Sequence, residues 1–382
     1  MVTPDKKRVA FNRPYQGKRA AEYVQQALSS HHHSGDGPWT LKATQELAQM
    51  LNGADVLLTP SGTHALELAC MTLDLGPDDE VIIPSFTFTS VATAALRSGS
   101  TVRFADVDHD TLGLSLATVV PLVNRRTRAV IAVHYAGRAR DLQDLRDYCD
   151  SQEIALIEDA AHALGGALEG KPLGSFGHLS CLSFHETKNL SCGEGGALVV
   201  NDPQLLRLAR IVREKGTNRF DLFNGYVDKY TWLGPGSSFL LSDISAAILC
   251  AAIEDFPVTQ NRRRSASQGY DAGLDDFIAR TGFTRPVQLP NHLNSHHMYY
   301  MLASSDAKRD AILDHCRNSH IQAVFHYQSL ARTPFGSSIA RYADPTPVSD
   351  DVSRRLLRLP LYSDIPDQAV AAVIAAFDGW RP

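Results

Sequence analysis

Leu179-Ser-Cys-Leu-Ser-Phe-His-Glu-Thr-Lys188 is an apolar run that turns polar and ends in a lysine. An earlier stretch, Ala155-Leu-Ile-Glu-Asp159, is a second short apolar run, and it ends in an aspartate. Continuous apolar runs of this length are typical of strands buried on both faces of a parallel sheet. Lys188 and Asp159 then follow the carboxyl ends of two strands, which is the edge where open α/β sheets bind ligands.

The pairing of a lysine with an aspartate at one sheet edge suits a particular cofactor. A lysine amine forms a Schiff base with an aldehyde, and a carboxylate holds a protonated pyridine nitrogen. Those are the two ends of pyridoxal 5'-phosphate (PLP), so we expect Lys188 and Asp159 to bind this cofactor. Taken alone, Lys188 would be a solvated surface amine and Asp159 a helix cap or turn residue. The position of both residues at strand ends favours the cofactor.

Strand-like and helix-like segments alternate along the first two thirds of the chain. The expected strands are the apolar runs at 56–58, 81–83, 102–104, 130–133, 155–158, 179–184 and 197–200. The expected helices lie at 18–29, from 62, near 88–97, near 141–151, from 203 and at 243–255. This alternation predicts an α/β fold with a mostly parallel, seven-stranded sheet that helices cover on both faces.

The pattern changes after Pro257. We interpret the run Arg262-Arg263-Arg264 as the solvated start of a long basic helix rather than as a track for phosphates. Beyond it, a helix near 307–318, a strand at 321–325 and helices near 350–357 and 367–378 indicate a compact α+β unit. We therefore predict a large domain over residues 1–255 and a smaller C-terminal domain over residues 256–382.

Composition excludes several classes of protein. The chain has 382 residues, 44% hydrophobic and 21% charged, with a net charge of −5, as in an ordinary globular protein without a nucleic-acid surface. No apolar segment is long enough to span a bilayer, and the N-terminus lacks the apolar stretch of a secretion signal, so we expect a cytoplasmic protein. The six cysteines form no Cys-x-x-Cys pair, and we interpret His31-His32-His33 as a polar loop, so no metal site is expected.

Thr59-Pro-Ser-Gly-Thr-His-Ala-Leu66 joins an expected strand to an expected helix through small, hydroxyl-bearing residues. Backbone N–H groups and the helix dipole make such a helix start an anion site, which suits the cofactor phosphate. The alternative is an ordinary Ser/Thr cap, which this octapeptide alone would favour. Together with the lysine and the aspartate, Ser61, Gly62 and Thr63 become the expected phosphate cradle, with Ser183 as a further candidate.

Pro84-Ser-Phe-Thr-Phe88 places two aromatic rings after another expected strand. One flat ring stacked on the pyridine would fix its plane, and the other then belongs to the core. His162 follows Asp159 closely, and it either approaches the cofactor oxygen or caps a helix. The sequence leaves both interpretations of this histidine open.

Five motifs occur in one order along the chain: Ser61-Gly-Thr63, Pro84-Ser-Phe-Thr-Phe88, Glu158-Asp-Ala-Ala-His162, Ser183-Phe-His-x-x-Lys-Asn189 and Gly193-Glu-Gly-Gly-Ala197. Together they resemble the PLP-dependent sugar-nucleotide aminotransferases, which have the aspartate-aminotransferase fold (PLP-dependent transferase fold type I). The resemblance implies that Lys188 is the Schiff-base lysine, that Asp159 binds the pyridine nitrogen and that Phe88 stacks on the ring. It also implies that Gly62, Thr63 and Ser183 bind the phosphate and that His162 lies near the ring oxygen.

The resemblance further implies a homodimer with shared active sites. In that arrangement a segment of one subunit reaches the cofactor phosphate of its neighbour. Many relatives carry an asparagine in this segment, whereas Gly236-Ser-Ser-Phe239 offers Ser238. A serine hydroxyl also donates a hydrogen bond, so we expect Ser238 to bind the neighbour's cofactor phosphate.

Four stretches bear on the substrate: 183–189, 213–219, 228–232 and 325–327. They resemble a narrower group of the family, the dTDP-4-amino-4,6-dideoxygalactose transaminases, which aminate a dTDP-4-keto-6-deoxyhexose with glutamate as donor. Lysine and arginine pair with a diphosphate, and aromatic rings pack on a base or a sugar. The expected substrate-binding residues are therefore Lys215, Arg219, Lys229, Tyr230, Trp232, His326 and Tyr327. The alternative is that these residues are surface charges and core aromatics.

Other functions share the scaffold that these motifs imply. Another sugar-nucleotide 3- or 4-aminotransferase would give a different product, such as the gluco isomer. A PLP-dependent sugar 3-dehydratase has a histidine where Lys188 stands, so the lysine disfavours it. A non-catalytic member would bind a sugar nucleotide as a regulator, and the intact Lys188, Asp159 and cradle disfavour that function.

Overall fold

The computed structural model of the protein describes residues 8–381. Its centre is a seven-stranded sheet with the order β1-β9-β8-β5-β4-β2-β3, which confirms the predicted α/β class. The strands are β1 (Asp55–Thr59), β2 (Glu80–Pro84), β3 (Thr101–Ala105), β4 (Thr127–Val133), β5 (Ala155–Asp159), β8 (Leu179–Ser183) and β9 (Gly196–Val200). Only β9 runs against its neighbours, so the sheet is mostly parallel, as the sequence predicts.

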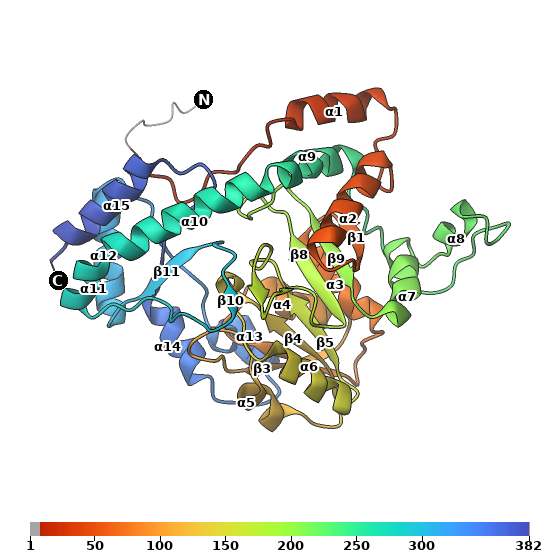
Figure 1. The fold of residues 1–382 in the computed structure, drawn as a ribbon. Helices are drawn as coiled ribbons and strands as arrows, with labels where there is room; N and C mark the ends of the chain where they lie inside the picture. The colour runs from red at the N-terminus through yellow and green to blue at the C-terminus, as the bar shows by residue number, and fades with distance from the viewer. Residues whose placement is uncertain (1–7, 382) are drawn as a thin grey trace.

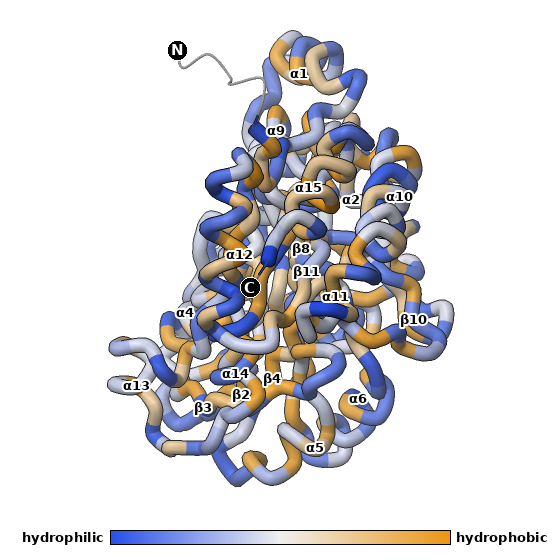
Figure 2. The backbone as a smooth tube through the Cα atoms, turned by 90° about the vertical axis from the view of Figure 1, so that its left-hand side faces the viewer, coloured by the Kyte–Doolittle hydropathy of each residue, from blue (hydrophilic) through white to orange (hydrophobic). Residues whose placement is uncertain are grey.

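Helices cover both faces of this sheet (Figure 1). Successive residues of one strand pack against different helices. Leu58 belongs to a cluster with the first set of helices, whereas Leu57 belongs to a cluster with the second set. The first set is α1 (Ala20–Ser29), α2 (Pro38–Met50) and α9 (Asp243–Glu254); the second is α3 (Gly62–Thr72), α4 (Thr89–Arg97) and α7 (Pro203–Arg213). In Figure 2 the hydrophobic colour follows the central strand β4. Burial on both sides explains why the strands are largely apolar.

The C-terminal part of the chain has its own hydrophobic cluster, which includes the buried Tyr270, Phe277, Met301 and Phe377. Its three-stranded sheet has the order β11-β13-β12. The elements are α10 (Phe256–Gly273), α11 (Asp275–Thr281), β11 (Tyr299–Leu302), α12 (Asp306–Asn318), β12 (Val324–Phe325), α14 (Pro347–Arg355), β13 (Leu356–Leu359) and α15 (Asp367–Gly379). The predicted boundary near residue 256 falls between α9 and α10, and it stays a prediction.

The remaining elements lie between those already named. They are α5 (Leu116–Val119), α6 (Leu142–Ser151), α8 (Arg219–Phe223), α13 (Pro334–Ile339), β6 (Ala167–Leu168), β7 (Lys171–Pro172), β10 (His292–Leu293) and three 3₁₀ turns at Val120–Leu122, Tyr135–Gly137 and Leu330–Arg332. Within residues 8–381, no helix is both long and apolar enough to cross a membrane.

Helix α2 was not predicted from the sequence, because the residue that caps this helix is distant in the sequence. The carboxylate of Asp243 accepts hydrogen bonds from the N–H of Trp39 (3.2 Å) and from the N–H and hydroxyl of Thr40 (2.7 and 2.8 Å). A Ser, Thr, Asp or Asn at the N-cap position would have indicated a helix start, but that position is Gly37, which has no side chain to accept a hydrogen bond. The signal for α2 therefore lies about 200 residues away in the chain.

Two predicted elements near the C-terminus need correction. The strand expected at 321–325 is reduced to Val324–Phe325, and Ile321 instead forms a bridge with Val9. The helix expected at 350–357 ends at Arg355, because Leu356 and Leu357 pair with Leu302 and Met301 of β11 and continue as β13. In both places pairing with a distant strand decides the local conformation.

Arg263 contradicts the interpretation of the arginine run as solvated. Its side chain is 2% exposed, and its guanidinium donates to the hydroxyl of Ser363 and the carbonyl of His297 (both 3.1 Å). Burial lowers the pKa of Arg263 to about 10. One face of α10 packs against the rest of the C-terminal part, so an arginine on that face is buried although its neighbours in sequence are exposed.

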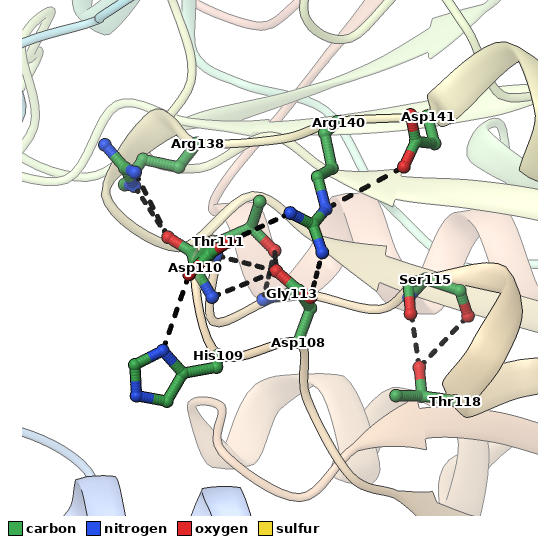
Figure 3. Close-up of polar contacts among 10 residues, drawn as sticks. All are labelled: Asp108, His109, Asp110, Thr111, Gly113, Ser115, Thr118, Arg138, Arg140 and Asp141. Carbon is green, nitrogen blue, oxygen red and sulfur yellow. Dashed lines mark hydrogen bonds and ion pairs between the residues drawn. The ribbon is translucent and has the colours of Figure 1, made fainter. Parts of the chain in front are cut away.

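Hydrogen bonds tie together two loops that follow the carboxyl ends of β3 and β4 (Figure 3). The carboxylate of Asp108 accepts the N–H groups of Asp110 and Thr111 (both 3.0 Å) and pairs with Arg140. Arg138 donates to the carbonyls of Asp110 (3.1 Å) and Val287 (2.5 Å). The loop after β4 is therefore held to the loop after β3 and to the returning C-terminal segment, which fixes one rim of the sheet edge.

Candidate active site

Asp159 and Lys188 come together at the carboxyl edge of the central sheet. Asp159 is the last residue of β5, and it is in register with Cys181 of the neighbouring parallel strand β8. Lys188 follows β8 through a turn in which its N–H donates to the carbonyl of His185 (2.9 Å). Because the two strands end side by side, an acid and an amine that are distant in sequence approach each other at the ligand-binding edge.

The charges of Lys188 and Asp159 act on each other in a buried setting. Burial, assisted by the positive charge of Arg358 and opposed by Asp159, lowers the pKa of Lys188 to about 8. Burial raises the pKa of Asp159, against the effects of a hydrogen bond from the Ala161 N–H (3.0 Å) and of the Lys188 charge. An amine with a pKa near 8 is available in its neutral, nucleophilic form at mildly alkaline pH.

Glu158 anchors the end of β5 from the opposite side. Its fully buried carboxylate accepts the N–H groups of Phe176 and Gly177 (2.7 and 2.6 Å) and a ring nitrogen of His134 lies 2.7 Å away. Burial alone would raise the pKa of Glu158, but these partners, His134 above all, hold it below its usual range. The adjacent Asp159 is thereby fixed at the strand end.

The start of α3 lies against the end of β8. Ser61 caps α3 by accepting the N–H of His64 (3.1 Å), and the first intrahelical bond joins the N–H of Ala65 to the carbonyl of Ser61. The N–H groups of Gly62 and Thr63 precede that bond, as in helix starts that bind anions. A Cβ at Gly62 would lie 2.9 Å from the Cβ of Ser183, so the two residues are in contact. The predicted cradle residues are thus neighbours in the structure.

The two phenylalanines after β2 have different environments. Phe86 is fully buried, with its ring centre 5.1 Å from that of Tyr135 and 5.7 Å from that of Tyr327. Phe88 is 54% exposed, at the start of α4, and its ring centre lies 5.9 Å from that of Tyr327. Phe86 is therefore the core residue of the pair. Stacking of Phe88 on a cofactor ring stays a prediction.

His162 is part of a pair of stacked imidazoles in the pocket. A turn rather than a helix follows β5, so His162 caps no helix. Its ring is stacked on His297 at 4.4 Å, and both rings line the pocket together with Ser183 and Lys188. Burial holds the pKa of both histidines well below the usual range, and the Lys188 charge adds to this effect. Both rings are therefore neutral at physiological pH.

A hydrogen-bonded chain of side chains lies beside His162, whose ring centre is 5.9 Å from that of Tyr135 and 6.3 Å from that of His326. His326 lies between Tyr135, whose hydroxyl is 2.8 Å from Nδ1, and Arg358, whose Nη1 donates to Nε2 (3.1 Å). The ring of Tyr327 lies 3.5 Å from that of His326, and its backbone has a φ of 35°. A tyrosine rarely adopts a positive φ, so this conformation carries strain at the edge of the site.

Sequence reasoning missed His297, which lines the pocket, and two residues beside it, Tyr135 and Arg358. Tyr135 follows the end of β4, so the rule that selected Asp159 and Lys188 could also have selected it. Arg358 is a single charge within the apolar run Leu356-Leu-Arg-Leu359, which was a usable signal. His297 carries no such signal, because a long connection after α11 brings it to the pocket.

The structure does not bring most of the predicted substrate residues to this pocket within one chain. They lie on an arm, residues 214–238, which projects from the body beyond α7 (Figure 1). Lys215, Arg219, Lys229, Tyr230 and Trp232 are all exposed, as is Ser238. The arm is folded mainly on itself: Thr217 forms a bridge with Trp232, and Glu214 forms one with Ser238. Of the predicted set, His326 and Tyr327 lie nearest this site: the His326 ring is 6.3 Å from that of His162, and the Tyr327 ring is 3.5 Å from that of His326.

The residues at the sheet edge fit PLP. The amine of Lys188 and the buried carboxylate of Asp159 lie close enough to shift each other's pKa. The start of α3 offers hydroxyl and N–H groups, and Ser183 approaches Gly62 so closely that a side chain at position 62 would not fit. These are the groups that bind an aldehyde, a pyridine nitrogen and a phosphate. Within residues 8–381, no cluster of three or more His, Cys, Asp or Glu side chains could hold a metal ion.

Comparisons with known proteins agree with this fit. Residues 14–378 match the DegT/DnrJ/EryC1/StrS aminotransferase family. The chain is 31% identical to dTDP-4-dehydro-2,3,6-trideoxy-D-glucose 4-aminotransferase of Saccharopolyspora spinosa, over 97% of this chain and 96% of that protein. The crystal structure of DesV from S. venezuelae is similar with a TM-score of 0.88 and 27% identity, covering 98% and 99% of the two chains. The aminotransferase TlmJ from Streptoalloteichus hindustanus has a TM-score of 0.87 and 27% identity, covering 96% and 97%.

The chain belongs to the DegT/DnrJ/EryC1/StrS aminotransferase family. It is a PLP-dependent aminotransferase, and the predictions of family, fold type and cofactor are confirmed.

Proposed function

We propose that the protein transfers an amine from glutamate to C4 of a dTDP-4-keto-6-deoxyhexose and gives dTDP-4-amino-4,6-dideoxygalactose. One observation supports aminotransfer above all: Lys188, with its lowered pKa, and the buried Asp159 lie at the ends of neighbouring strands. The proposed substrate rests on the motifs at 183–189, 213–219, 228–232 and 325–327.

PLP, when bound, supplies an aldehyde and an electron sink, which together let an amine move between carbon atoms. Lys188 holds the cofactor, and once released its amine carries a proton to or from the reacting carbon. Asp159 keeps a proton on the ring nitrogen. Ser61, Gly62, Thr63 and Ser183 bind the phosphate, and the neutral His162 lies beside the ring oxygen.

We further propose a homodimer in which the arm of one subunit completes the site of the other. The exposed side chains on the arm support this arrangement, because Trp232, a large aromatic residue, is 76% exposed in the single chain. Lys215, Arg219 and Lys229 would then meet the diphosphate of the nucleotide, with Tyr230 and Trp232 on its apolar faces. Ser238 would reach the cofactor phosphate of the partner.

Cofactor attachment tests the first half of the proposal. Reduction of the PLP-loaded protein with borohydride should fix the cofactor to the peptide that contains Lys188, as identified by mass spectrometry. Attachment at any other lysine would overturn the role of Lys188. A protein whose absorbance does not change with glutamate would point instead to a non-catalytic sugar-nucleotide binder.

Product analysis tests the second half. The protein is incubated with glutamate and a panel of nucleotide-linked keto-sugars, and the products are identified by mass and NMR. We expect an axial amine at C4 from dTDP-4-keto-6-deoxyglucose. An equatorial C4 amine would assign the protein to the gluco-type 4-aminotransferases, and an amine at C3 would exclude 4-amination.

A second candidate substrate has support from one relative. The S. spinosa protein is named for a 4-dehydro sugar that lacks hydroxyls at C2 and C3 as well as C6. The same panel therefore includes the dTDP-linked 4-keto-2,3,6-trideoxy sugar. If that compound is aminated faster than the 6-deoxy compound, it replaces the 6-deoxyhexose as the assigned substrate.

A further inference from the structure

Two buried serines join the end of β2 to the loop that follows β12. The hydroxyl oxygens of Ser85 and Ser329 lie 2.8 Å apart, and the two residues are 0% and 2% exposed. The Ser85 hydroxyl also accepts the N–H of Ala331 (3.1 Å), and the Ser85 carbonyl accepts the N–H of Leu330 (2.8 Å). Ser85 therefore holds three successive residues of the C-terminal part. We call Ser85 and Ser329, with these hydrogen bonds, the serine clamp.

The loop that the serine clamp holds contains a strained residue. Tyr327, two positions before Ser329, has a φ of 35°, which a tyrosine rarely adopts. Such a backbone conformation persists only where the surrounding contacts determine it. Before Tyr327, the ring of His326 is hydrogen-bonded to Tyr135 (2.8 Å), and after it the clamp holds Ser329. Contacts on both sides along the chain thus fix Tyr327.

The serine clamp also fixes the rings that Tyr327 contacts. Phe86 and Phe88 follow Ser85 closely in the chain, and their ring centres lie 5.7 and 5.9 Å from that of Tyr327. Because Ser85 is part of the phenylalanine segment and also bonds the loop of Tyr327, it sets the spacing between them. The charge of Asp159 acts on the Tyr327 hydroxyl, so the Tyr327 ring is close both to the buried Asp159 and to the exposed Phe88.

The two substrates of the proposed reaction differ in size. Glutamate presents its amine on a short chain, whereas a nucleotide-linked keto-sugar extends from C4 across its ring to a diphosphate and a base. The larger substrate must pass residues that lie between the reactive groups and solvent, and the smaller one reacts without filling that space. A shift of Tyr327 relative to Phe88 should therefore affect the keto-sugar more than glutamate.

We propose that Ser85 and Ser329 are positioning residues that hold Tyr327 against Phe88 and so seat the keto-sugar substrate. The inference rests on the proposed function in one respect, namely that the amine acceptor is a nucleotide-linked keto-sugar. It adds two residues that the sequence motifs did not select, and it gives the strained backbone of Tyr327 a purpose.

The alternative is that the serine clamp only ties the C-terminal part to the central sheet. A second tie between the same parts provides a matched control. Ser349 at the start of α14 is fully buried, and its hydroxyl donates to the carboxylate of Asp106, which follows β3 (2.8 Å). Ser349→Ala removes a buried hydrogen bond between the two parts, as Ser329→Ala does, and it leaves the loop of Tyr327 clamped.

The two half-reactions test the clamp separately. The absorbance change of the PLP-loaded protein with glutamate gives the first, and the KM for the keto-sugar reports on the second. In Ser329→Ala and Ser85→Ala we expect the KM for the keto-sugar to rise roughly 3- to 10-fold, the range that corresponds to the loss of one hydrogen bond. The glutamate half-reaction should keep its wild-type rate, and Ser349→Ala should change neither. An unchanged KM, or equal slowing of both half-reactions, would overturn the proposal.

A second measurement needs no substrate. Tyr327→Gly and Tyr327→Ala both lack the ring, and they are compared by urea unfolding of the PLP-loaded protein with Ser329 intact and with Ser329→Ala. At a positive φ glycine is favoured over alanine, so the glycine variant should unfold at the higher urea concentration while the clamp is intact. Without the clamp the loop relaxes to a negative φ, where alanine is favoured, and the gap should shrink or reverse. An equal gap in both backgrounds would show that the clamp does not hold Tyr327.

The two measurements separate this inference from the proposed function. If the wild type aminates no keto-sugar, the proposed function fails together with the seating of the sugar, and the comparison of glycine with alanine still decides whether the clamp holds Tyr327. Circular dichroism shows whether each variant is folded. If Ser329→Ala does not fold, Ser85→Ala takes its place in both measurements.

Discussion

The pocket and the arm of this protein differ in how completely one chain builds them. In the pocket, neighbouring strand ends hold Asp159 and Lys188 in place, and both side chains interact with partners in their own chain. On the arm, residues 214–238, Phe223, Tyr226 and Trp232 are 72%, 75% and 76% exposed. Large aromatic side chains gathered on one exposed segment mark an interaction surface. Under the proposed function, one chain assembles the chemistry, and the arm recognises the substrate only together with a second subunit.

Backbone hydrogen bonds hold the base of the arm to α7, from the N–H of Gly216 to the carbonyl of Ile211 and from the N–H of Ser237 to the carbonyl of Val212 (both 2.9 Å). The side-chain contacts of the outer part of the arm lie nearer the surface. Arg210 of α7 lies over the ring of Phe220 (4.2 Å), and Arg207 forms a long ion pair with Asp221 (3.7 Å). Exposed ion pairs and cation–π contacts contribute only about 0–1 kcal/mol each. The arm is therefore expected to have low local stability until a partner covers it.

Among the changes to the pocket or the arm, removal of the Lys188 amine should lower turnover the most. We expect Lys188→Ala to lower turnover by at least about 10⁴-fold, because the variant loses both cofactor attachment and a positioned proton carrier. Steady-state kinetics with glutamate and the preferred keto-sugar would measure this. Circular dichroism should show an intact fold. Residual turnover above about one percent of wild type would mean that another group carries the proton.

Loss of the Asp159 carboxylate, at the end of β5, should have the next largest effect on turnover. In Asp159→Asn an amide replaces the carboxylate, so the ring nitrogen loses the anion that keeps it protonated, and we expect roughly 10²- to 10³-fold slower turnover. Unfolding by urea should be little changed, because the Ala161 N–H can still donate to the amide oxygen.

His162→Asn serves as the comparison for the acid, since His162 is already neutral in the pocket and its replacement should cost less. Wild-type turnover in Asp159→Asn would remove the assigned role of Asp159. A larger loss in His162→Asn than in Asp159→Asn would reverse the ranking of the two residues.

Mixed dimers should show whether the arm acts across a subunit boundary. Lys188→Ala and Ser238→Glu are each expected to be inactive, the second because a carboxylate at Ser238 repels the cofactor phosphate. In a mixed dimer with shared sites, one site has an intact lysine and an intact arm. Random mixing should therefore restore about a quarter of the wild-type activity.

The alternative arrangement is a site completed by its own arm. Phe239, next to Ser238, has its ring 5.6 Å from that of His64, and His64 contacts the cap residue Ser61 of the same chain. In that case mixing would restore nothing, because each mutation damages its own subunit. Confirmed exchange of subunits without recovery would thus reject a shared site.

The same contrast governs what could be predicted from the sequence. Strands buried on both faces leave continuous apolar runs, so all seven strands of the sheet and the acid and amine at their ends were predictable. Asp159 and Lys188 stand where the apolar runs give way to polar residues, so this change in the sequence marks the edge of the sheet. Tyr135 obeyed the same rule and could have been found.

Features that depend on distant partners could not be predicted. Helix α2 takes its cap from Asp243, β13 exists because Leu356 and Leu357 pair with β11, and Arg263 is buried because Ser363 and backbone carbonyls accept its hydrogen bonds. The arm residues were selected by motif, and a motif does not say in which subunit a side chain acts. The roles of the individual site residues remain predictions.

The smallest expected effect is a change in the stability of the cofactor-free protein with pH, caused by Lys188. Lys188 has a pKa of about 8 in the folded protein, below the ordinary value of about 10.4 that it regains on unfolding. Between these two values the unfolded chain binds a proton that the folded chain has released. The free energy of unfolding therefore rises with pH across this window. The cofactor-free protein should gain stability from Lys188 as the pH increases from about 8 to about 10.

Lys188→Met isolates this contribution, because methionine fills a similar space without an ionisable amine. Urea unfolding of both cofactor-free proteins from pH 7.5 to 10 gives the difference in free energy, in which tyrosines and other titrating groups cancel. The difference should shift in favour of the wild type as the pH rises, because the buried lysine is charged at the lower end and neutral at the upper end. A difference that stays constant would mean that Lys188 is solvated in the folded protein. The pocket would then resemble the arm, with an amine that needs its ligand or its partner before it is buried.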